Sequence, residues 1–84
     1  MGLLQIDKKQ YFIVVFSNET KVIQNEMFLK NKGFETKIIS IPRKISSGCG
    51  MALRCKISDK EKIIDLMNKN NIKYVSIINM EEIW

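Results

Sequence analysis

Apolar and polar stretches alternate along the chain in a pattern of six segments. The first, Tyr11–Phe16, is β-branched or aromatic at every position, which predicts a buried strand. Residues 19–32 carry apolar positions at helical spacing, after the capping residues Ser17 and Asn18. Gly33 follows, and glycine favours the left-handed conformation that ends a helix. We therefore expect a strand and then a helix.

The remaining pattern predicts three more strands and a second helix. Their expected ranges are a strand over 36–41, a strand over 51–57, a helix that is capped by Ser58 and closes at 68–71, and a strand over 72–79. Pro42 ends the first of these strands, because proline lacks the N–H that a ladder needs. Alternation in the next strand places Leu53 and Cys55 on its apolar face and Arg54 on the other.

The order strand, helix, strand, strand, helix, strand is the ferredoxin-like, split βαβ pattern of the α+β class. It predicts a four-stranded antiparallel sheet with both helices on one face and the first and third strands in the centre. We expect a single domain over residues 1–84, with its core at about 10–79.

The first strand is apolar on both of its faces, although helices cover only one face of such a sheet. Tyr11, Ile13 and Val15 alternate with Phe12, Val14 and Phe16. A solvated face would be polar, so the open face is expected to be covered by a second copy of the chain, by a partner or by the terminal tail with Trp84. A central strand that is simply hydrophobic explains the pattern equally well.

The length and composition argue against a membrane-spanning or secreted protein. The chain has 84 residues and no apolar run of the roughly 20 residues that span a bilayer. Its first ten residues, MGLLQIDKKQ, lack the features of a signal peptide. We expect a cytoplasmic protein without membrane contact and with reduced cysteines.

The net charge is +5 and comes mostly from lysines spread along the chain. Such a distribution favours solubility and a weak attraction for anions or an acidic partner over nucleic-acid binding. There is no histidine, which excludes the usual histidine-based catalytic triads. Without histidine or a CxxC pair we expect no metal site and no cofactor.

The segment between the second and third strands carries the candidate chemistry. Cys49 lies between Gly48 and Gly50, which leave its sulfur open and allow backbone amides to turn inward. A thiol reacts as the thiolate, which nearby cations and donors stabilise. Such groups lie just upstream in sequence: Arg43, Lys44, Ser46 and Ser47. The alternative is a small cysteine in a tight turn, and both interpretations stay open.

Cys55 is expected to pack in the apolar layer with Leu53 and Ile57. A disulfide to Cys49 is not expected, because six extended residues separate the two by about 20 Å.

The stretch from Pro42 to Arg54, PRKISSGCGMALR, resembles the signature of the DUF3343 family of selenium/sulfur carrier proteins, which are small single domains common in bacteria. The resemblance extends over about residues 10–79. The positions that match the signature are Pro42, Arg43, Ser46, Ser47, Cys49, Gly50, Ala52, Leu53 and Arg54, and the match adds Arg54 to the expected anion site. Lys44 replaces a common acidic residue, Gly48 a common serine, and Cys55 an apolar residue.

The resemblance implies a carrier that is not itself a catalyst. Its Cys49 thiolate would accept sulfur or selenium from a donor protein, as a persulfide or selenosulfide, and pass it to an acceptor. A second hypothesis is a dimeric regulatory module that binds an anion through Arg43, the two serines and the loop amides. RNA binding by the open sheet face is disfavoured, because the third strand has no aromatic residue for base stacking.

Overall fold

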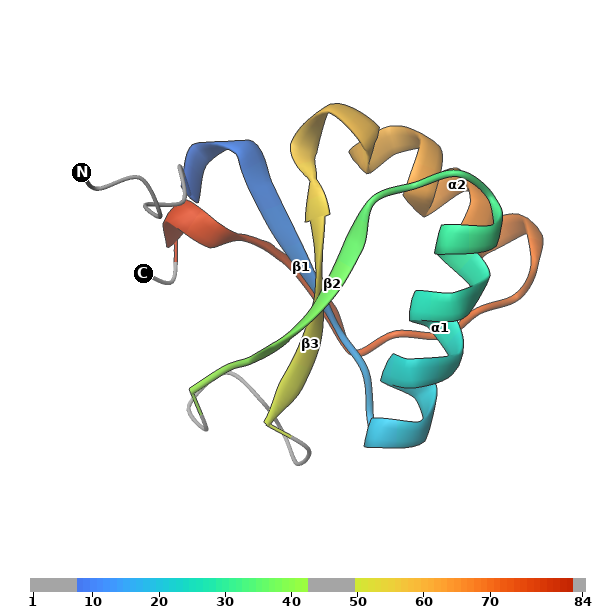
Figure 1. Cartoon of the computed structure of the whole chain (residues 1–84), viewed down its shortest axis with the longest axis horizontal. Coiled ribbons are helices and arrows are strands. Elements are labelled where there is room, and N and C mark those ends of the chain that lie inside the picture. The colour runs from blue at the N-terminus through green and yellow to red at the C-terminus, as the bar shows by residue number, and fades with distance from the viewer. Residues whose placement is uncertain (1–7, 43–49, 83–84) are drawn as a thin grey trace.

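The fold was examined in a computed structural model that describes residues 8–42 and 50–82. Four strands form one antiparallel sheet in the order β2-β3-β1-β4. The strands are β1 (Tyr11–Val15), β2 (Thr36–Ser40), β3 (Met51–Lys56) and β4 (Ser76–Asn79). Two helices, α1 (Glu19–Asn31) and α2 (Lys60–Lys69), lie on the same side of the sheet (Figure 1). The α+β class, the ferredoxin-like topology and the central position of β1 and β3 are thereby confirmed.

The register of the central strands explains the core beneath the helices. Phe12 pairs with Cys55, and Val14 pairs with Leu53, so all four side chains face the helices. The largest buried cluster contains these residues together with Phe16, Val22, Leu29, Ile63 and Met67. The predicted alternation of both strands is therefore correct.

Helix α1 begins and ends as its sequence predicts. The Asn18 side-chain oxygen accepts a hydrogen bond from the Lys21 backbone N–H at 2.9 Å, which satisfies one of the free donors of the first turn. After the helix, Gly33 has φ +92°, the left-handed conformation that glycine adopts without strain. Local chemistry at the two ends thus sets the length of this helix.

Helix α2 starts later than predicted. A short 3-10 turn, η2 (Ile57–Asp59), follows β3, so Ser58 lies inside this turn and the predicted Ser58 cap is wrong. Asp59 is the residue that precedes the helix, and its side chain makes no capping hydrogen bond.

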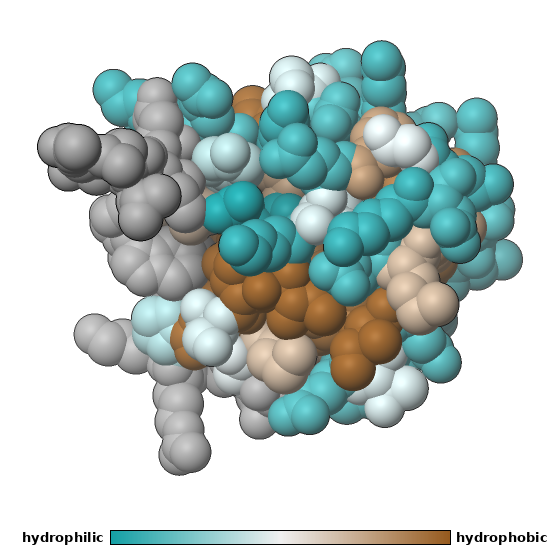
Figure 2. Space-filling model, in the orientation of Figure 1, coloured by the Kyte–Doolittle hydropathy of each residue, from teal (hydrophilic) through white to brown (hydrophobic). Residues whose placement is uncertain are grey.

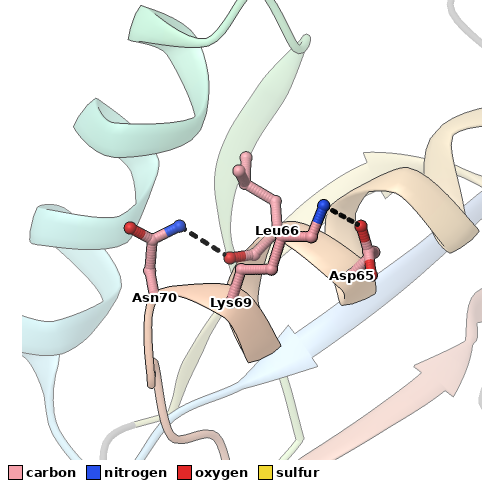
Figure 3. A network of polar contacts seen from close by, with 4 residues as sticks. All are labelled: Asp65, Leu66, Lys69 and Asn70. Atoms are coloured by element: carbon pink, nitrogen blue, oxygen red, sulfur yellow. Dashed lines mark hydrogen bonds and ion pairs between the residues drawn. The ribbon is translucent and has the colours of Figure 1, made fainter.

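The other end of α2 is closed by side chains of its last turn. The Asn70 side-chain amide donates to the Leu66 carbonyl at 2.8 Å, and Lys69 pairs with Asp65 at 3.2 Å (Figure 3). Asn71 then takes φ +55°, the left-handed value expected of an asparagine at this point.

Strand β4 is shorter than the predicted range of 72–79. The Ile72 N–H donates to the Met67 carbonyl at 2.9 Å, which completes the end of α2. Residues 72–75 therefore connect the helix to the sheet. The Val75 N–H donates to the Val15 carbonyl of β1 at 2.7 Å, and the residue pairs of the β1–β4 ladder start at Ser76.

The chain itself covers the middle of the face opposite the helices. Ile13 and Val15 have no exposed surface, and they pack in a second cluster with Ile41, Ala52 and Met80. Met80 opens a 3-10 turn, η3 (Met80–Glu82), which lies beside η1 (Lys8–Gln10) at the start of β1 (Figure 1). The expected cover by the terminal tail is thus found at Met80, while Trp84 lies outside the described residues.

Within the two described stretches, neither helix combines the length and apolar character needed to cross a membrane.

Candidate functional site

The segment that carries the candidate cysteine starts and ends at neighbouring points of the sheet. The Ile41 N–H donates to the Gly50 carbonyl at 2.9 Å, one step beyond the Ser40–Met51 pair of the β2–β3 ladder. The ladder thus holds Ile41 and Gly50 side by side, on either side of the segment that carries Cys49.

Gly50 has φ +67°, in the left-handed region that disfavours other residues. A Cβ atom built at this position would meet no atom within 4 Å. The requirement for glycine is therefore conformational: Gly50 sets the direction in which the chain enters β3, and it is not there to leave space.

Most of the predicted site residues lie outside the described residues, so their positions stay predictions. They are Arg43, Lys44, Ser46, Ser47, Gly48 and Cys49. Gly50 and Arg54 are the two members of the expected site that the structure places.

Arg54 lies in the middle of β3, on the face opposite the helices, between Ile13 of β1 and Lys37 of β2. Its guanidinium carbon is 4.4 Å from the centre of the Tyr11 ring. Tyr11 pairs with Lys56, so the Arg54 side chain extends away from Gly50. The two backbones are already about 13 Å apart along an extended strand. The structure therefore does not bring the Arg54 guanidinium to the base of the loop.

The Arg54–Tyr11 contact was missed in the sequence. Neither residue pattern nor spacing relates positions 11 and 54, because only the strand register sets them diagonally across the ladder. The Arg54 Nε atom is also buried, and it has no hydrogen-bond partner among the described residues. The Tyr11 ring packs against this end of the side chain.

Cys55 is a free thiol in the main core, with no exposed surface. Its pKa is raised from 9.0 to about 12, mainly by burial and to a lesser extent by the Asp59 carboxylate, while the Arg54 guanidinium acts in the opposite direction. The thiol is therefore protonated at neutral pH and out of reach of a reactant. This outcome agrees with the predicted packing role of Cys55.

A polar hollow of about 290 Å³ lies between α1 and the segment before β4. Its lining residues are Lys21, Gln24, Asn25, Asn71, Ile72 and Lys73. None of these belongs to the expected site. Across residues 8–42 and 50–82, no cluster of three or more histidine, cysteine, aspartate or glutamate side chains is placed to hold a metal ion.

Comparison with known proteins identifies a family. A family model described as "Putative Se/S carrier protein-like" matches residues 11–79, which include all four strands and both helices. No curated protein and no solved structure matches the chain. Because the matched region is most of the sequence and includes the PRKISSGCGMALR segment, the resemblance in the sequence is confirmed. The chain belongs to the Se/S carrier-like protein family.

Proposed function

We propose that the protein carries sulfur or selenium on the thiol of Cys49, between a donor protein and an acceptor protein. It would act as a carrier and not as a catalyst in its own right. Family membership supports the class of cargo. The reducing cytoplasm is the compartment where such a thiol stays available for transfer.

The burial of Cys55 is the observation that carries this proposal. The sequence has two cysteines, and a transferring sulfur must be both accessible and ionised. Cys55 has no exposed surface, and its pKa is raised to about 12. We therefore assign the reactive role to Cys49, the cysteine of the family signature.

The backbone at the base of the loop supports the proposal that the Cys49 thiol is accessible to a partner protein. Gly50 follows Cys49 directly and takes φ +67°, and the Ile41–Gly50 hydrogen bond closes the base of the loop. In the proposal, the cations and donors of the loop stabilise the thiolate: Arg43, Lys44, Ser46, Ser47 and the amides of Gly48 and Gly50. Arg54 is not among these groups, because its guanidinium is engaged with Tyr11, away from Gly50.

The transfer step requires no oxidant or reductant. The Cys49 thiolate attacks the outer sulfur of a donor persulfide and forms a new S–S bond. The S–S bond of the donor breaks, and the donor cysteine leaves as a thiolate. A donor selenosulfide reacts in the same way, through its selenium atom. The carrier then passes the outer atom to the acceptor thiolate by the same exchange, so the number of S–S or S–Se bonds is conserved.

Loading by a cysteine desulfurase with cysteine as substrate tests the proposal. We expect intact-protein mass spectrometry to show the mass increment of one sulfur atom, and peptide mapping to place it on Cys49. Cys49→Ser should abolish the adduct, while the matched variant Cys55→Ser should retain it. An adduct that survives Cys49→Ser and is lost in Cys55→Ser would reverse the assignment.

The anion-binding hypothesis gives a different result in a parallel measurement. A module that binds anions without thiol chemistry would show an anion-induced rise in melting temperature that is unchanged in Cys49→Ala, and it would acquire no sulfur from the desulfurase.

A further inference from the structure

Strand β2 forms one edge of the sheet, and its outer side has no strand partner in the described part of the chain. The Ile41 N–H points inward, to the carbonyl of Gly50 just before β3. Because inward and outward groups alternate along an antiparallel strand, the N–H and C=O groups of Thr36, Ile38 and Ser40 point outward. This edge therefore offers a row of backbone donors and acceptors that pair with no other strand in the described ranges 8–42 and 50–82.

Apolar surface surrounds this edge. Ile38 and Ile39 face opposite sides of the sheet, and both are only partly buried. On α1, which lies over β2 and β3, Ile23 is 47% exposed. Figure 2 shows apolar surface spreading from the middle of the sheet edge to the lower turns of α1. Exposed apolar side chains beside an unpaired strand favour addition of another strand.

Ile23 lies on the flank of α1 that is turned toward this edge. The opposite flank carries Lys21 and Gln24, which line the polar hollow together with residues 71–73 of the α2–β4 connection. Helical geometry places Ile23, Glu26 and Lys30 together on the other side of the helix. The exposed flank of α1 thus adjoins the edge strand. We call the two together the β2 edge surface, which consists of Ile23, Ile38, Ile39, Ser40 and Thr36; the side chain of Thr36 is buried, so this residue offers its outward backbone groups.

We propose that the β2 edge surface binds a second copy of the chain, with the two β2 strands antiparallel and Ile38 on the two-fold axis. In this register the outward groups of Thr36, Ile38 and Ser40 all meet outward groups of the second copy. Lys37, the charged residue of β2, lies opposite Ile39 of the second copy and not opposite another lysine. The strand is therefore complementary to itself.

Two further features fit this pairing. The Thr36 hydroxyl oxygen is buried and has no hydrogen-bond partner. The register places Ser40 of the second copy directly opposite Thr36, and threonine–serine pairs across strands form hydrogen bonds. Neighbouring strands are about 4.8 Å apart, and α1 lies over β2 and β3. The two α1 helices of the dimer would therefore be separated by about two strand spacings, roughly 10 Å, which is close to the spacing of packed helices.

This pairing differs from a dimer through the open face of the sheet. That face is filled at its centre, since Ile13 and Val15 are fully covered within one chain. The pairing also stands independently of the proposed role of Cys49, because it rests on the strand register and on exposed side chains.

Sedimentation equilibrium of the full chain, together with register-specific crosslinking, tests the proposal. In a Cys49→Ser background, Ile38→Cys should form a disulfide-linked dimer with the oxidant diamide, because paired Cα atoms at a hydrogen-bonded site are about 5.5 Å apart. The matched variant Ile39→Cys should stay monomeric on a non-reducing gel, because it faces Lys37 and not itself.

Two exposed apolar residues provide a second readout that does not endanger the fold. Ile23→Lys should raise the dimer dissociation constant about tenfold or more, because it removes apolar contact from both copies. Val75→Lys, at a 49% exposed position before β4, should leave that constant unchanged. A chain that sediments as a monomer at every concentration, or equal crosslinking of Ile38→Cys and Ile39→Cys, would overturn the proposal.

Discussion

The guanidinium carbon of Arg54 lies 4.4 Å from the centre of the Tyr11 ring, on the side of the sheet opposite the helices. Tyr11 begins β1, and Arg54 occupies the middle of β3, one diagonal step away in the ladder. A guanidinium over an aromatic face is attracted by the ring and also packs against it. The contact joins the two central strands at a distance from the loop, so we expect Arg54 to act first on stability.

Replacing either partner of this stack should weaken the fold slightly. Tyr11→Leu and Arg54→Lys should each lower the free energy of unfolding by about 0.5–1 kcal/mol, since lysine does not reproduce a stacked guanidinium. Urea denaturation measures both effects, and the double variant should cost less than the sum of the two. Strict additivity would show that the ring and the guanidinium do not interact energetically.

Gly50 should be sensitive to any side chain because of its backbone conformation. Gly50→Ala places Cβ at φ +67° and should lower the free energy of unfolding by about 1–2 kcal/mol, although space is available. Thermal or urea unfolding measures the loss.

The matched control for Gly50 is Gly33→Ala, at φ +92° after α1. It should destabilise the protein comparably, but only Gly50→Ala should also slow sulfur loading by the desulfurase, because Gly50 adjoins Cys49. If both variants load at the wild-type rate, the conformation of Gly50 has no part in the transfer.

Patterns that depend on neighbours in sequence predicted the fold well. The periodicity of β1 and β3 gave their buried faces, the alternation placed Cys55 in the core, and Gly33 marked the end of α1. Local details that depend on tertiary contacts, such as the start of α2, were not predicted. Ser58 was assigned as a cap because its residue type is suitable, but β3 runs into a 3-10 turn that occupies this position.

The same distinction between sequence patterns and tertiary contacts holds for the candidate site. Its chemistry was inferred from residue types between Pro42 and Arg54, and the structure adds the conformation of Gly50 and the hydrogen bond that closes the loop. The partner of Arg54 followed only from the register, which places Tyr11 beside it. Similarly, cover of the open face by Met80 depends on how the chain turns after β4.

Met80 should stabilise the fold through the second apolar cluster. The side chain is 6% exposed and packs with Ile13 and Val15. Met80→Ala should lower the free energy of unfolding by about 2 kcal/mol, through lost burial and the cavity that remains. Glu81→Ala, at the exposed neighbouring position, should change it little. Equal stability of the two variants would show that other groups keep Ile13 and Val15 covered.

The buried thiol of Cys55 should make stability depend on pH in the alkaline range. In the folded protein its pKa is about 12, whereas the unfolded thiol ionises near pH 9. Between these values the unfolded state binds fewer protons, so stability falls as the pH rises, by up to about 1.4 kcal/mol per pH unit. Below pH 9 both states keep the proton, and this contribution is fully present.

Urea unfolding at a series of pH values, compared between wild type and Cys55→Ala, isolates this contribution from other groups that titrate in the same range. The variant should be less stable near neutral pH, because it leaves a cavity beside Phe12, and its stability should fall less steeply above pH 9. Cys49→Ser should keep the steep decline of the wild type. Parallel slopes for wild type and Cys55→Ala, or rapid alkylation of Cys55 in the native protein, would show that this thiol is not held protonated in the core.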